Sequence, residues 1–242
     1  MAKTALITGG AKRIGKALAL HLATKGWNIA IHYHSSQTEA MRLQEELKAL
    51  FPDQVFEIFR ADLNEAAEVE NLLPQVLLSM PKIDLLVNNA SVFDKCSFAE
   101  TSTDLLDRNM NINFRAPFIL TRDFIRLVSE GVIINLVDTK ITTNQSNYAA
   151  YSLSKKALWE LTKMTALEQG PRIRCNAIAP GLTLAPEGKQ EDYLEKMAAH
   201  IAMKRPGGVH PVLRALDYIL DNDYLTGQLL FCDGGENLGL TN

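Results

Sequence analysis

The sequence has few cysteines and no metal-binding cluster around them. Its three cysteines, Cys96, Cys175 and Cys232, are far apart, and no Cys-x-x-Cys or Cys/His group surrounds them. An odd, scattered set argues against a disulfide framework and against a zinc site, so we expect no metal in the functional site. Such cysteine usage is typical of a reducing compartment, and we expect the cytoplasm.

Long apolar runs and an excess of positive charge are also missing. No apolar run approaches the roughly 18 residues of a membrane-spanning helix, and residues 1–8 lead into an expected strand without the apolar core of a signal peptide. Lys and Arg number 25 against 28 Asp and Glu, which leaves a net charge of −3. We therefore expect a soluble protein with no membrane segment and no nucleic-acid partner.

What the sequence does have is a regular alternation of short apolar runs with amphipathic stretches. The apolar runs predict seven strands, at residues 5–8, 28–33, 55–60, 83–87, 132–137, 174–178 and 228–232. Helical periodicity is clearest over 65–80, 102–129 and 149–169. This alternation indicates a parallel sheet with crossover helices. We expect an α/β fold: a single Rossmann-like, doubly wound domain over residues 1–242, with a central seven-stranded parallel sheet flanked by helices.

Local signals refine this outline. Ser36-Gln-Thr-Glu39 has the spacing of a capping box and predicts a helix start, and Gly26 stands where the first helix should have its C-cap. Residues 185–211 mix short helical runs with Pro and Gly. We expect this stretch to form a mobile lid over a substrate site.

A spacing in the second half of the chain indicates acid–base chemistry. Tyr151 and Lys155 are four residues apart and would share a helix face, so the ammonium would favour the ionised phenol and lower its pKa from about 10 toward neutrality. Asp138 follows an apolar run, and its carboxylate would face the phenol from the end of a buried strand. We expect Tyr151 to be a proton donor. The alternative is a helix with an ordinary Tyr and Lys, because this spacing is common.

A glycine-rich turn follows the first predicted strand. The segment Thr8-Gly-Gly-Ala-Lys-Arg-Ile-Gly15 opens a helix as a dinucleotide-binding turn does, with glycines that let the backbone approach a pyrophosphate at the helix N-terminus. Lys12 and Arg13 add positive charge there. The alternative is merely a tight turn.

The end of the second predicted strand lacks the acidic residue that receives the ribose of NAD in many dinucleotide folds. The sequence there is His32-Tyr33-His34-Ser35-Ser36. The missing carboxylate, two hydroxyls and the nearby Arg13 favour the 2′-phosphate of NADPH. Taken singly, Ser36 could be only a helix cap, and His34 an exposed strand-end residue.

Five motifs in this order resemble the short-chain dehydrogenase/reductases. They are Thr8-Gly9…Gly15, Asn88-Asn89-Ala90, Asn113, Tyr151-x-x-x-Lys155 and Pro180-Gly181. The resemblance implies that Asn113 bends a helix and anchors a water linked to Lys155, which also binds the nicotinamide ribose. The implied cofactor contacts are Gly9, Lys12, Arg13, Ile14, Gly15, Tyr33, His34, Ser35, Ser36, Asp62, Leu63, Asn89, Ala90, Ser91, Lys155, Pro180, Gly181 and Leu182.

Two departures from the general family pattern point to a subgroup. Most members carry serine thirteen residues before the tyrosine, where this chain has Asp138, and a small residue where Arg13 falls. With Ser91, Phe93 and the residues 32–36, these features resemble the pteridine reductases and dihydromonapterin reductases. Some members of this subgroup carry arginine at the position of Ser35. The absence of that positive charge would weaken the binding of a 2′-phosphate.

The carboxylate of Asp138 also indicates the class of substrate, independently of the family resemblance. A ketone reductase must stabilise a developing alkoxide, which a neighbouring carboxylate would repel. A C=N nitrogen gains positive character as it is protonated, so the same carboxylate attracts it and relays a proton. Asp138 therefore favours an imine-like substrate; its alternative role is a helix cap or a salt bridge. Phe93 could sandwich a flat pterin against the nicotinamide, or simply close the core.

These observations predict NADPH-dependent reduction of a dihydropterin to a tetrahydropterin. The expected catalytic residues are Asp138, Tyr151, Lys155 and Asn113, and the expected substrate contacts are Arg13, Ser91, Phe93, Asp138 and Tyr151. The resemblance also implies a homotetramer packed through two long helices. Two alternatives stay open: a carbonyl reductase acting on a 3-oxoacyl thioester, a sugar or a xenobiotic ketone, and a non-enzymatic NADPH-sensing regulator.

Overall fold

A computed structural model describes residues 2–144, 146–186, 188 and 192–239. Seven strands form one sheet in the order β3-β2-β1-β4-β5-β6-β7, and every neighbouring pair is parallel. The strands are β1 (Thr4–Ile7), β2 (Asn28–Tyr33), β3 (Phe56–Arg60), β4 (Leu85–Asn88), β5 (Gly131–Leu136), β6 (Ile173–Pro180) and β7 (Leu229–Cys232). The predicted seven-stranded parallel sheet is confirmed. Its order reverses between β1 and β4, where open α/β sheets form their ligand crevice.

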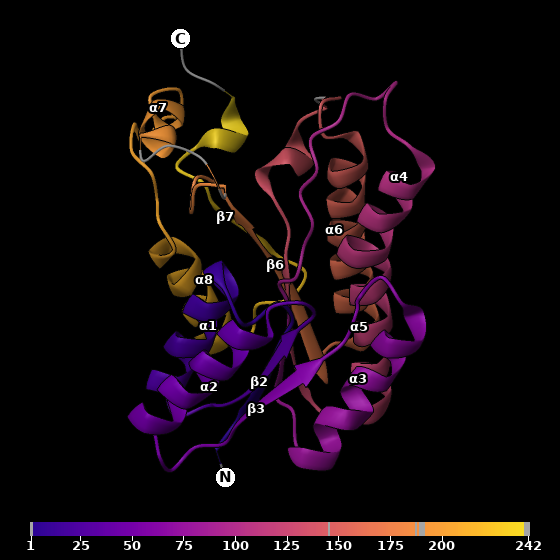
Figure 1. The fold of residues 1–242 in the computed structure, drawn as a ribbon, viewed down its shortest axis with the longest axis vertical. Coiled ribbons are helices and arrows are strands. Elements are labelled where there is room, and N and C mark those ends of the chain that lie inside the picture. Colours follow the sequence, from indigo (N-terminus) through magenta and orange to yellow (C-terminus); the bar gives the residue numbers. More distant parts are fainter. Residues whose placement is uncertain (1, 145, 187, 189–191, 240–242) are drawn as a thin grey trace.

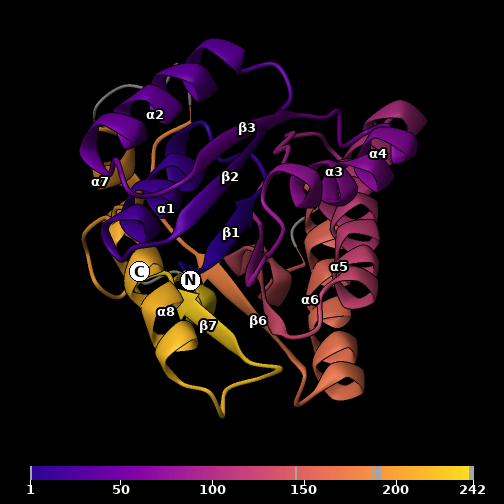
Figure 2. The same cartoon turned by 90° about the horizontal axis from the view of Figure 1, so that it is seen from below.

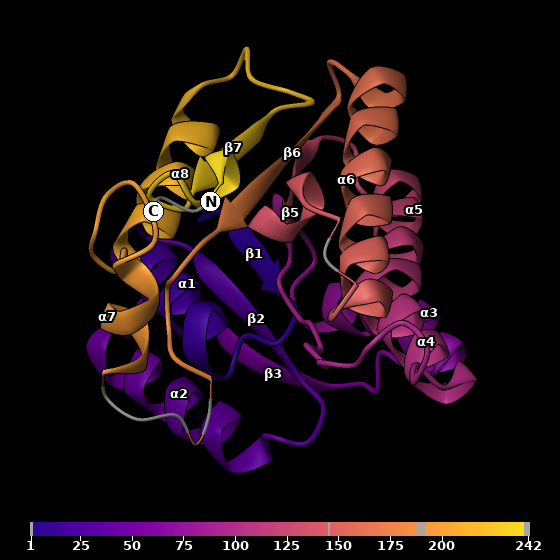
Figure 3. The ribbon, with the colours of Figure 1, turned by 90° about the horizontal axis from the view of Figure 1, so that it is seen from above.

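Helices cover both faces of the sheet (Figure 1). One side carries α1 (Arg13–Thr24), α2 (Gln37–Leu50) and α8 (His210–Asp221), and the other carries α3 (Ala66–Ser79), α5 (Ala116–Leu127) and α6 (Ala149–Gln169). Views from below and above show the same two layers (Figures 2 and 3). Shorter elements complete the described fold: α4 (Thr103–Met110), η1 (Asn111–Arg115), η2 (Thr139–Thr142), α7 (Tyr193–Ala198) and η3 (Glu236–Leu238).

Strand side chains contribute to two hydrophobic clusters, and one cluster lies beneath each layer of helices. In β1, Ala5 and Ile7 pack toward α1 and α8, while Leu6 packs toward α3 and α5. Both faces of the strand are fully buried, which is why apolar residues run without a break there. Truncating a residue such as Leu6 to alanine would cost about 2–5 kcal/mol of stability. This rigid sheet positions the loops that follow its strands.

The stretch 102–129 is not one regular helix. It divides into α4, a π-helical turn over Asn111–Arg115, and α5, which ends at Leu127. A π-turn inserts an extra residue per turn and shifts the side chains that follow it. Periodicity of 3.6 residues could not predict this turn, whose buried member is Asn113.

The two predicted caps have different outcomes. Gly26 has φ of +84°, and the amides of Gly26 and Trp27 bond to the carbonyls of Ala23 and Leu22, which is a Schellman end to α1. Ser36 is at the N-cap position of α2, but its side chain makes no capping hydrogen bond. The predicted helix start is therefore confirmed, but the capping hydrogen bond of Ser36 does not form, and Glu39 pairs with Lys12, 3.1 Å away on the glycine-rich turn.

The expected lid over 185–211 is described only in part. Residues 187 and 189–191 lie outside the described residues, so the lid stays a prediction. After α7, Ile201 and Met203 pack close to Gly234, and the amide of Met203 bonds to the Gly234 carbonyl. Among the described residues, we find no helix with the length and apolarity needed to cross a bilayer.

Candidate active site

The carboxylate of Asp138 and the phenol of Tyr151 meet at the end of β5. Asp138 follows that strand after one intervening residue, Val137, and caps η2, with its Oδ1 accepting the Lys140 amide at 2.8 Å. Tyr151, in the first turn of α6, donates its hydroxyl to Asp138 Oδ2 at 2.7 Å. Asp138 therefore both caps a short helix and binds the phenol, one oxygen for each. Its predicted position facing Tyr151 agrees with this geometry.

Lys155 lies one turn further along α6 and is almost fully buried, with 2% of its surface exposed. Its ammonium donates to the Leu136 carbonyl at 2.7 Å and lies 5.8 Å from the centre of the Tyr151 ring. Burial lowers the pKa of Lys155 to about 8, against the opposing attraction of Asp138.

The expected lowering of the Tyr151 pKa is wrong for this structure. Burial, reinforced by the charge of Asp138 and the bond to it, raises the pKa of Tyr151 well above its usual value, and a bond with Ser91 opposes this only weakly. Burial is the main cause, and the geometry adds to it: the carboxylate contacts the phenolic oxygen, whereas the Lys155 ammonium is bonded to a backbone carbonyl. The phenol therefore keeps its proton at neutral pH, as a proton donor must.

Asn113, in the π-turn, organises the loop after β4. Its Oδ1 accepts the Val92 amide at 2.9 Å and the Ser91 hydroxyl at 3.0 Å, and its Nδ2 donates to the Ser154 hydroxyl at 3.1 Å. Asn113 thereby ties Ser91 to α6, close to Tyr151. The helix is irregular at this residue, as the family resemblance implies; its water-mediated link to Lys155 stays a prediction.

The glycine-rich turn packs so tightly that side chains would not fit. A Cβ on Gly15 would lie 2.1 Å from the Gly9 carbonyl oxygen, and Gly9 has φ of +60°. Asn89 holds the turn from β4, since its Nδ2 donates to the carbonyls of Thr8 at 2.8 Å and Gly9 at 3.1 Å. The first amides of α1 have no partner within the helix, which leaves them able to bind an anion.

His32 also braces this turn, from the middle of the sheet. Its Nδ1 accepts the Gly9 amide at 3.0 Å, and its Nε2 is 3.0 Å from the Ala61 carbonyl. Only the neutral ring with its proton on Nε2 satisfies both partners. Burial lowers the pKa of His32 to about 4, so the ring is neutral at physiological pH.

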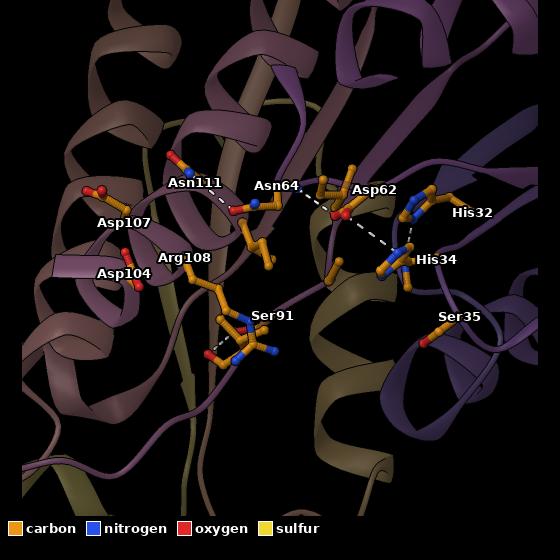
Figure 4. Close-up of a pocket in the computed structure, with 15 residues that line it drawn as sticks. His32, His34, Ser35, Asp62, Asn64, Ser91, Asp104, Asp107, Arg108 and Asn111 are labelled. Carbon is orange, nitrogen blue, oxygen red and sulfur yellow. Dashed lines mark hydrogen bonds and ion pairs between the residues drawn. The ribbon is translucent and has the colours of Figure 1, made fainter. Parts of the chain in front are cut away.

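A cavity of about 640 Å³ opens beside the turn, between the ends of β2, β3 and β4 and the helix α4 (Figure 4). Seven of the expected cofactor contacts line it: Gly9, His34, Ser35, Asp62, Leu63, Ala90 and Ser91. His34 faces Asp62, with Nε2 and Oδ2 3.5 Å apart. The α4 residues Asp104, Asp107 and Arg108 form the wall opposite His34 and Ser35. The cavity is thus polar on both sides.

Several expected contacts lie elsewhere. The side chain of Tyr33 is buried in the core beneath α1 and α2, because alternate strand residues point to opposite faces, so only its backbone faces the cavity side of the sheet end; its contact with the cofactor stays a prediction. Ile14 also packs against that core. Lys12 is paired with Glu39, and Ser36 is partly exposed next to Ser35.

Arg13 reaches across to the segment after β6. Its guanidinium donates to the carbonyls of Ala185 at 3.0 Å and Leu184 at 3.2 Å, and its backbone has φ of +52°, which is strained for a residue with a side chain. In this structure Arg13 therefore ties the predicted lid to the glycine-rich turn. Its expected contacts with cofactor and substrate stay predictions.

The segment Pro180-Gly181-Leu182 leads from the end of β6 toward the residues that Arg13 contacts. A Cβ on Gly181 would lie 2.5 Å from the Asp233 Cα, so only glycine allows the approach, and the Leu182 carbonyl accepts the Gly207 amide at 3.0 Å. The segment joins the strand end to the base of the predicted lid.

Phe93 is next to the acid–base pair, 48% exposed. Its ring stacks on Tyr148 at 4.6 Å and meets the Tyr151 ring edge-on at 4.7 Å, while the Lys140 ammonium lies over the Phe93–Tyr148 stack. A half-exposed ring does not close a core, so that alternative for Phe93 is wrong. The arrangement places a flat apolar surface beside a proton donor.

These contacts together suit a dinucleotide. The tight turn, the first amides of α1 and the polar cavity are of the kind that accommodates a pyrophosphate and an adenosine, and Lys155 lies beside the acid–base pair. The model of the family described as short chain dehydrogenase matches residues 3–195. The chain belongs to the short-chain dehydrogenase family.

Individual members of the family resemble the chain over nearly its whole length. The 3-oxoacyl-[acyl-carrier-protein] reductase FabG of Staphylococcus aureus is 30% identical, over 97% of this chain and 98% of its own. Pteridine reductase 1 of Leishmania tarentolae is 29% identical, over 98% and 97%. The crystal structure of FolM alternative dihydrofolate reductase 1 from Brucella canis, complexed with NADP, is 32% identical with a TM-score of 0.91, over 99% and 96%.

Sequence reasoning missed three groups near the site. His32 was detectable, because a histidine inside the apolar run of β2 must find partners when buried. Tyr148 and Lys140 contact Phe93 through the fold of the β5–α6 connection, which no local pattern reports. Among the described residues, no group of three or more His, Cys, Asp or Glu is arranged to hold a metal ion.

Proposed function

We propose that this protein is an NADPH-dependent reductase of dihydropterins, forming the tetrahydro product. The observation that carries the proposal is the bond of 2.7 Å from the Tyr151 hydroxyl to Asp138. A carboxylate at this point repels a developing alkoxide and attracts a nitrogen that is gaining a proton. Pterin rings contain C=N bonds of this kind.

The residues at the end of β2 support NADPH over NADH. No carboxylate follows Tyr33 there, the Ser36 hydroxyl is not used as a helix cap, and His34 and Ser35 line the cavity. Hydroxyls and a histidine are suited to a phosphate rather than to the ribose hydroxyls of NAD. The complex of the Brucella canis protein with NADP agrees with this choice.

Side chains of the protein donate the proton to the substrate and orient the substrate in the pocket. NADPH, when bound, supplies a hydride to the substrate carbon. Tyr151 donates its phenolic proton to the substrate nitrogen, and Asp138 stabilises the positive character of that nitrogen. Lys155 binds the nicotinamide ribose and, as a buried cation, stabilises the phenolate left behind. Phe93 supplies the face on which the pterin stacks, and Ser91, held by Asn113, borders the same pocket.

A comparison of substrate classes tests the proposal. NADPH consumption is measured with dihydrobiopterin or dihydromonapterin and, in parallel, with a panel that contains a 3-oxoacyl thioester, a sugar ketone and a xenobiotic ketone. We expect turnover of the dihydropterins to dominate. Robust ketone turnover without pterin turnover would overturn the assignment.

A carbonyl reductase is the second candidate, favoured by the 30% identity to the Staphylococcus aureus 3-oxoacyl reductase. That identity is no lower than the 29% to pteridine reductase 1, so overall similarity does not separate the two activities. The local chemistry does, because Asp138 is unsuited to an oxyanion. A regulator without activity is a third candidate, and measurable turnover of any substrate eliminates it.

We also propose a homotetramer that packs through α5 and α6. Their outer surfaces expose Phe118, Met164 and Leu167, the last two at 68% and 89%. Apolar side chains grouped on long helices are typical of subunit contacts. Light scattering coupled to size-exclusion chromatography should give the mass of four chains; a monomer would contradict this proposal without affecting the proposed activity.

A further inference from the structure

The loop of residues 91–96, which carries Phe93, is held at both of its ends. Its first residues are hydrogen-bonded to Asn113 in η1, as described above. At its other end the Cys96 amide donates to the Asn147 carbonyl at 2.9 Å, just before α6 begins. Phe93 lies between these two fixed points.

A third set of contacts joins Asp94, the residue after Phe93, to the helix α4. Arg108 Nη1 donates to Asp94 Oδ2 at 3.1 Å and to Asp94 Oδ1 at 3.4 Å. Asn109 Nδ2 donates to the same Oδ2 at 3.3 Å. The carboxylate therefore accepts hydrogen bonds from two adjacent residues of one helix, which restricts the direction in which it leaves the loop.

Asn109 is the buried partner in these contacts. It is fully buried, its Nδ2 also donates to the Leu105 carbonyl at 2.9 Å, and its Oδ1 accepts from Asn113 Nδ2 at 3.4 Å. The contact with Asp94 therefore belongs to the same hydrogen-bonded group that holds the start of the loop.

Arg108 is the exposed partner. Its side chain is 51% exposed and lines the cavity beside the glycine-rich turn, where Figure 4 shows it extending from α4 toward Ser91. An exposed ion pair contributes little to the free energy of unfolding. We therefore expect this pair to act on the loop rather than on the stability of the whole fold.

The position of the Phe93 ring depends on these contacts. Nearly half of Phe93 is exposed, and its ring stacks on Tyr148 and meets Tyr151 edge-on. Its two neighbours, Val92 and Asp94, both hydrogen-bond to the α4–η1 segment, so the backbone is held on each side of the ring. Surface loops are otherwise more mobile than the elements that they connect.

We propose that Asp94 is a positioning residue that holds the Phe93 ring ready to stack on the substrate. The inference rests on the proposed function, in which a flat dihydropterin lies against Phe93. Asp94 acts through its neighbour, because its carboxylate is directed to α4 rather than to the acid–base pair. A ring that is ordered before the substrate arrives removes the entropy cost of ordering it on binding, so the contact should lower KM.

The test measures steady-state kinetics and NADPH binding in the full-length protein and in single variants. Asp94→Ala removes both acceptor oxygens, whereas Asp94→Asn keeps the size and one oxygen for Asn109 and so tests rescue by a conservative side chain. Lys48→Ala is the matched control, because it removes an ion pair with Glu57 between α2 and β3, and Lys48 is 51% exposed like Arg108.

We expect Asp94→Ala to raise KM for dihydrobiopterin or dihydromonapterin about five- to tenfold, the cost of ordering one side chain on binding. The value of kcat and the dissociation constant for NADPH should change by less than about twofold, because the acid–base pair and the cofactor contacts are intact. Asp94→Asn should give a KM between those of Asp94→Ala and the wild-type protein, and Lys48→Ala should match the wild-type protein.

A double variant shows whether Asp94 acts through the ring. Phe93→Ala alone should raise KM, and the addition of Asp94→Ala should raise KM no further, since the positioned ring is gone. Additive effects of the two substitutions would overturn the proposal, because Asp94 would then act independently of Phe93.

The remaining outcomes separate this proposal from the proposed function. No turnover of dihydropterins by the wild-type protein overturns the proposed function, and the role of Asp94 with it. Turnover by the wild-type protein with an unchanged KM in Asp94→Ala overturns only the role of Asp94. A parallel loss of kcat, substrate affinity and NADPH affinity in that variant also overturns it, because this pattern indicates a structural role.

Discussion

The hydroxyl of Tyr151 donates to Asp138 Oδ2 at 2.7 Å, and this single contact sets the proton chemistry of the site. It combines with burial to raise the pKa of the phenol, so the proton donor is protonated over the whole physiological range. It also places a carboxylate where other family members carry a hydroxyl donor. Both consequences can be tested by substitution.

Removing either partner should suppress turnover while leaving the cofactor bound. We expect Asp138→Asn and Tyr151→Phe to lower kcat about 10²- to 10⁴-fold, the usual contribution of a positioned acid or base. The dissociation constant for NADPH, measured by fluorescence titration, should change by less than about threefold. Tyr224→Phe is the control, since Tyr224 is 96% exposed. Full turnover in the first two variants would remove both residues from the mechanism.

Lys155 should be functionally necessary but destabilising. Its pKa is lowered from 10.5 to about 8, which corresponds to roughly 3 kcal/mol against burying its charged form at neutral pH. Lys155→Met removes that penalty and leaves the Leu136 carbonyl without its donor, at about 1 kcal/mol. We expect urea unfolding at about pH 7 to give a variant that is about 1–2 kcal/mol more stable and inactive.

The pH dependence of that difference follows from the same shift. Between about pH 8 and pH 10.5 the unfolded chain binds more protons than the folded chain at this residue, so wild-type stability rises with pH there. The advantage of Lys155→Met should therefore be largest below about pH 8 and fade above it. Lys156→Met, which affects only a surface bond to Asn144, should show neither effect.

His32 should make the protein acid-sensitive. Its folded pKa is about 4 against 6.5 in the unfolded chain, so its stabilising contribution is complete above about pH 6.5 and is lost as the pH falls toward 4. The loss amounts to roughly 3 kcal/mol, because burial disfavours the charged ring. Protonation of Nδ1 also removes the acceptor for the Gly9 amide.

Unfolding curves at several pH values between about 4 and about 7 check this expectation. His32→Gln should be less stable at neutral pH and show a weaker pH dependence across that interval. His210→Gln, at the exposed start of α8, should follow the wild-type curve. Parallel curves for the wild-type protein and His32→Gln would contradict the assigned role of His32.

The sheet was predictable because its strands are buried on both faces and appear as short apolar runs. The contact between Asp138 and Tyr151 was predictable too, since a strand end and a helix start thirteen residues apart are brought together by one connection. The upward shift of the Tyr151 pKa could not be predicted. It depends on the burial of the phenol and on the hydrogen bond from Lys155 to a backbone carbonyl, and the spacing of residues in the sequence indicates neither.

Other features of the structure have physical causes of their own. Side chains alternate along β2, so Ile31 and Tyr33 lie in one core and His32 lies on the opposite face, where it lines the cavity. At the predicted capping box, Glu39 pairs with Lys12, a contact between residues distant in sequence that no local pattern predicts. The packing of η3 against η2 brings together segments far apart in the sequence, which no local pattern predicts.

The most direct test of the central claim is a substrate comparison between the wild-type protein and Asp138→Ser. At about 4 Å and an effective dielectric constant near 20, one charge contributes about 4 kcal/mol, enough to decide between an oxyanion and a protonating nitrogen. We expect the ratio of kcat/KM for a dihydropterin to kcat/KM for a 3-oxoacyl thioester to fall at least about 10²-fold in the variant. A ratio that is unchanged by the substitution would contradict the account.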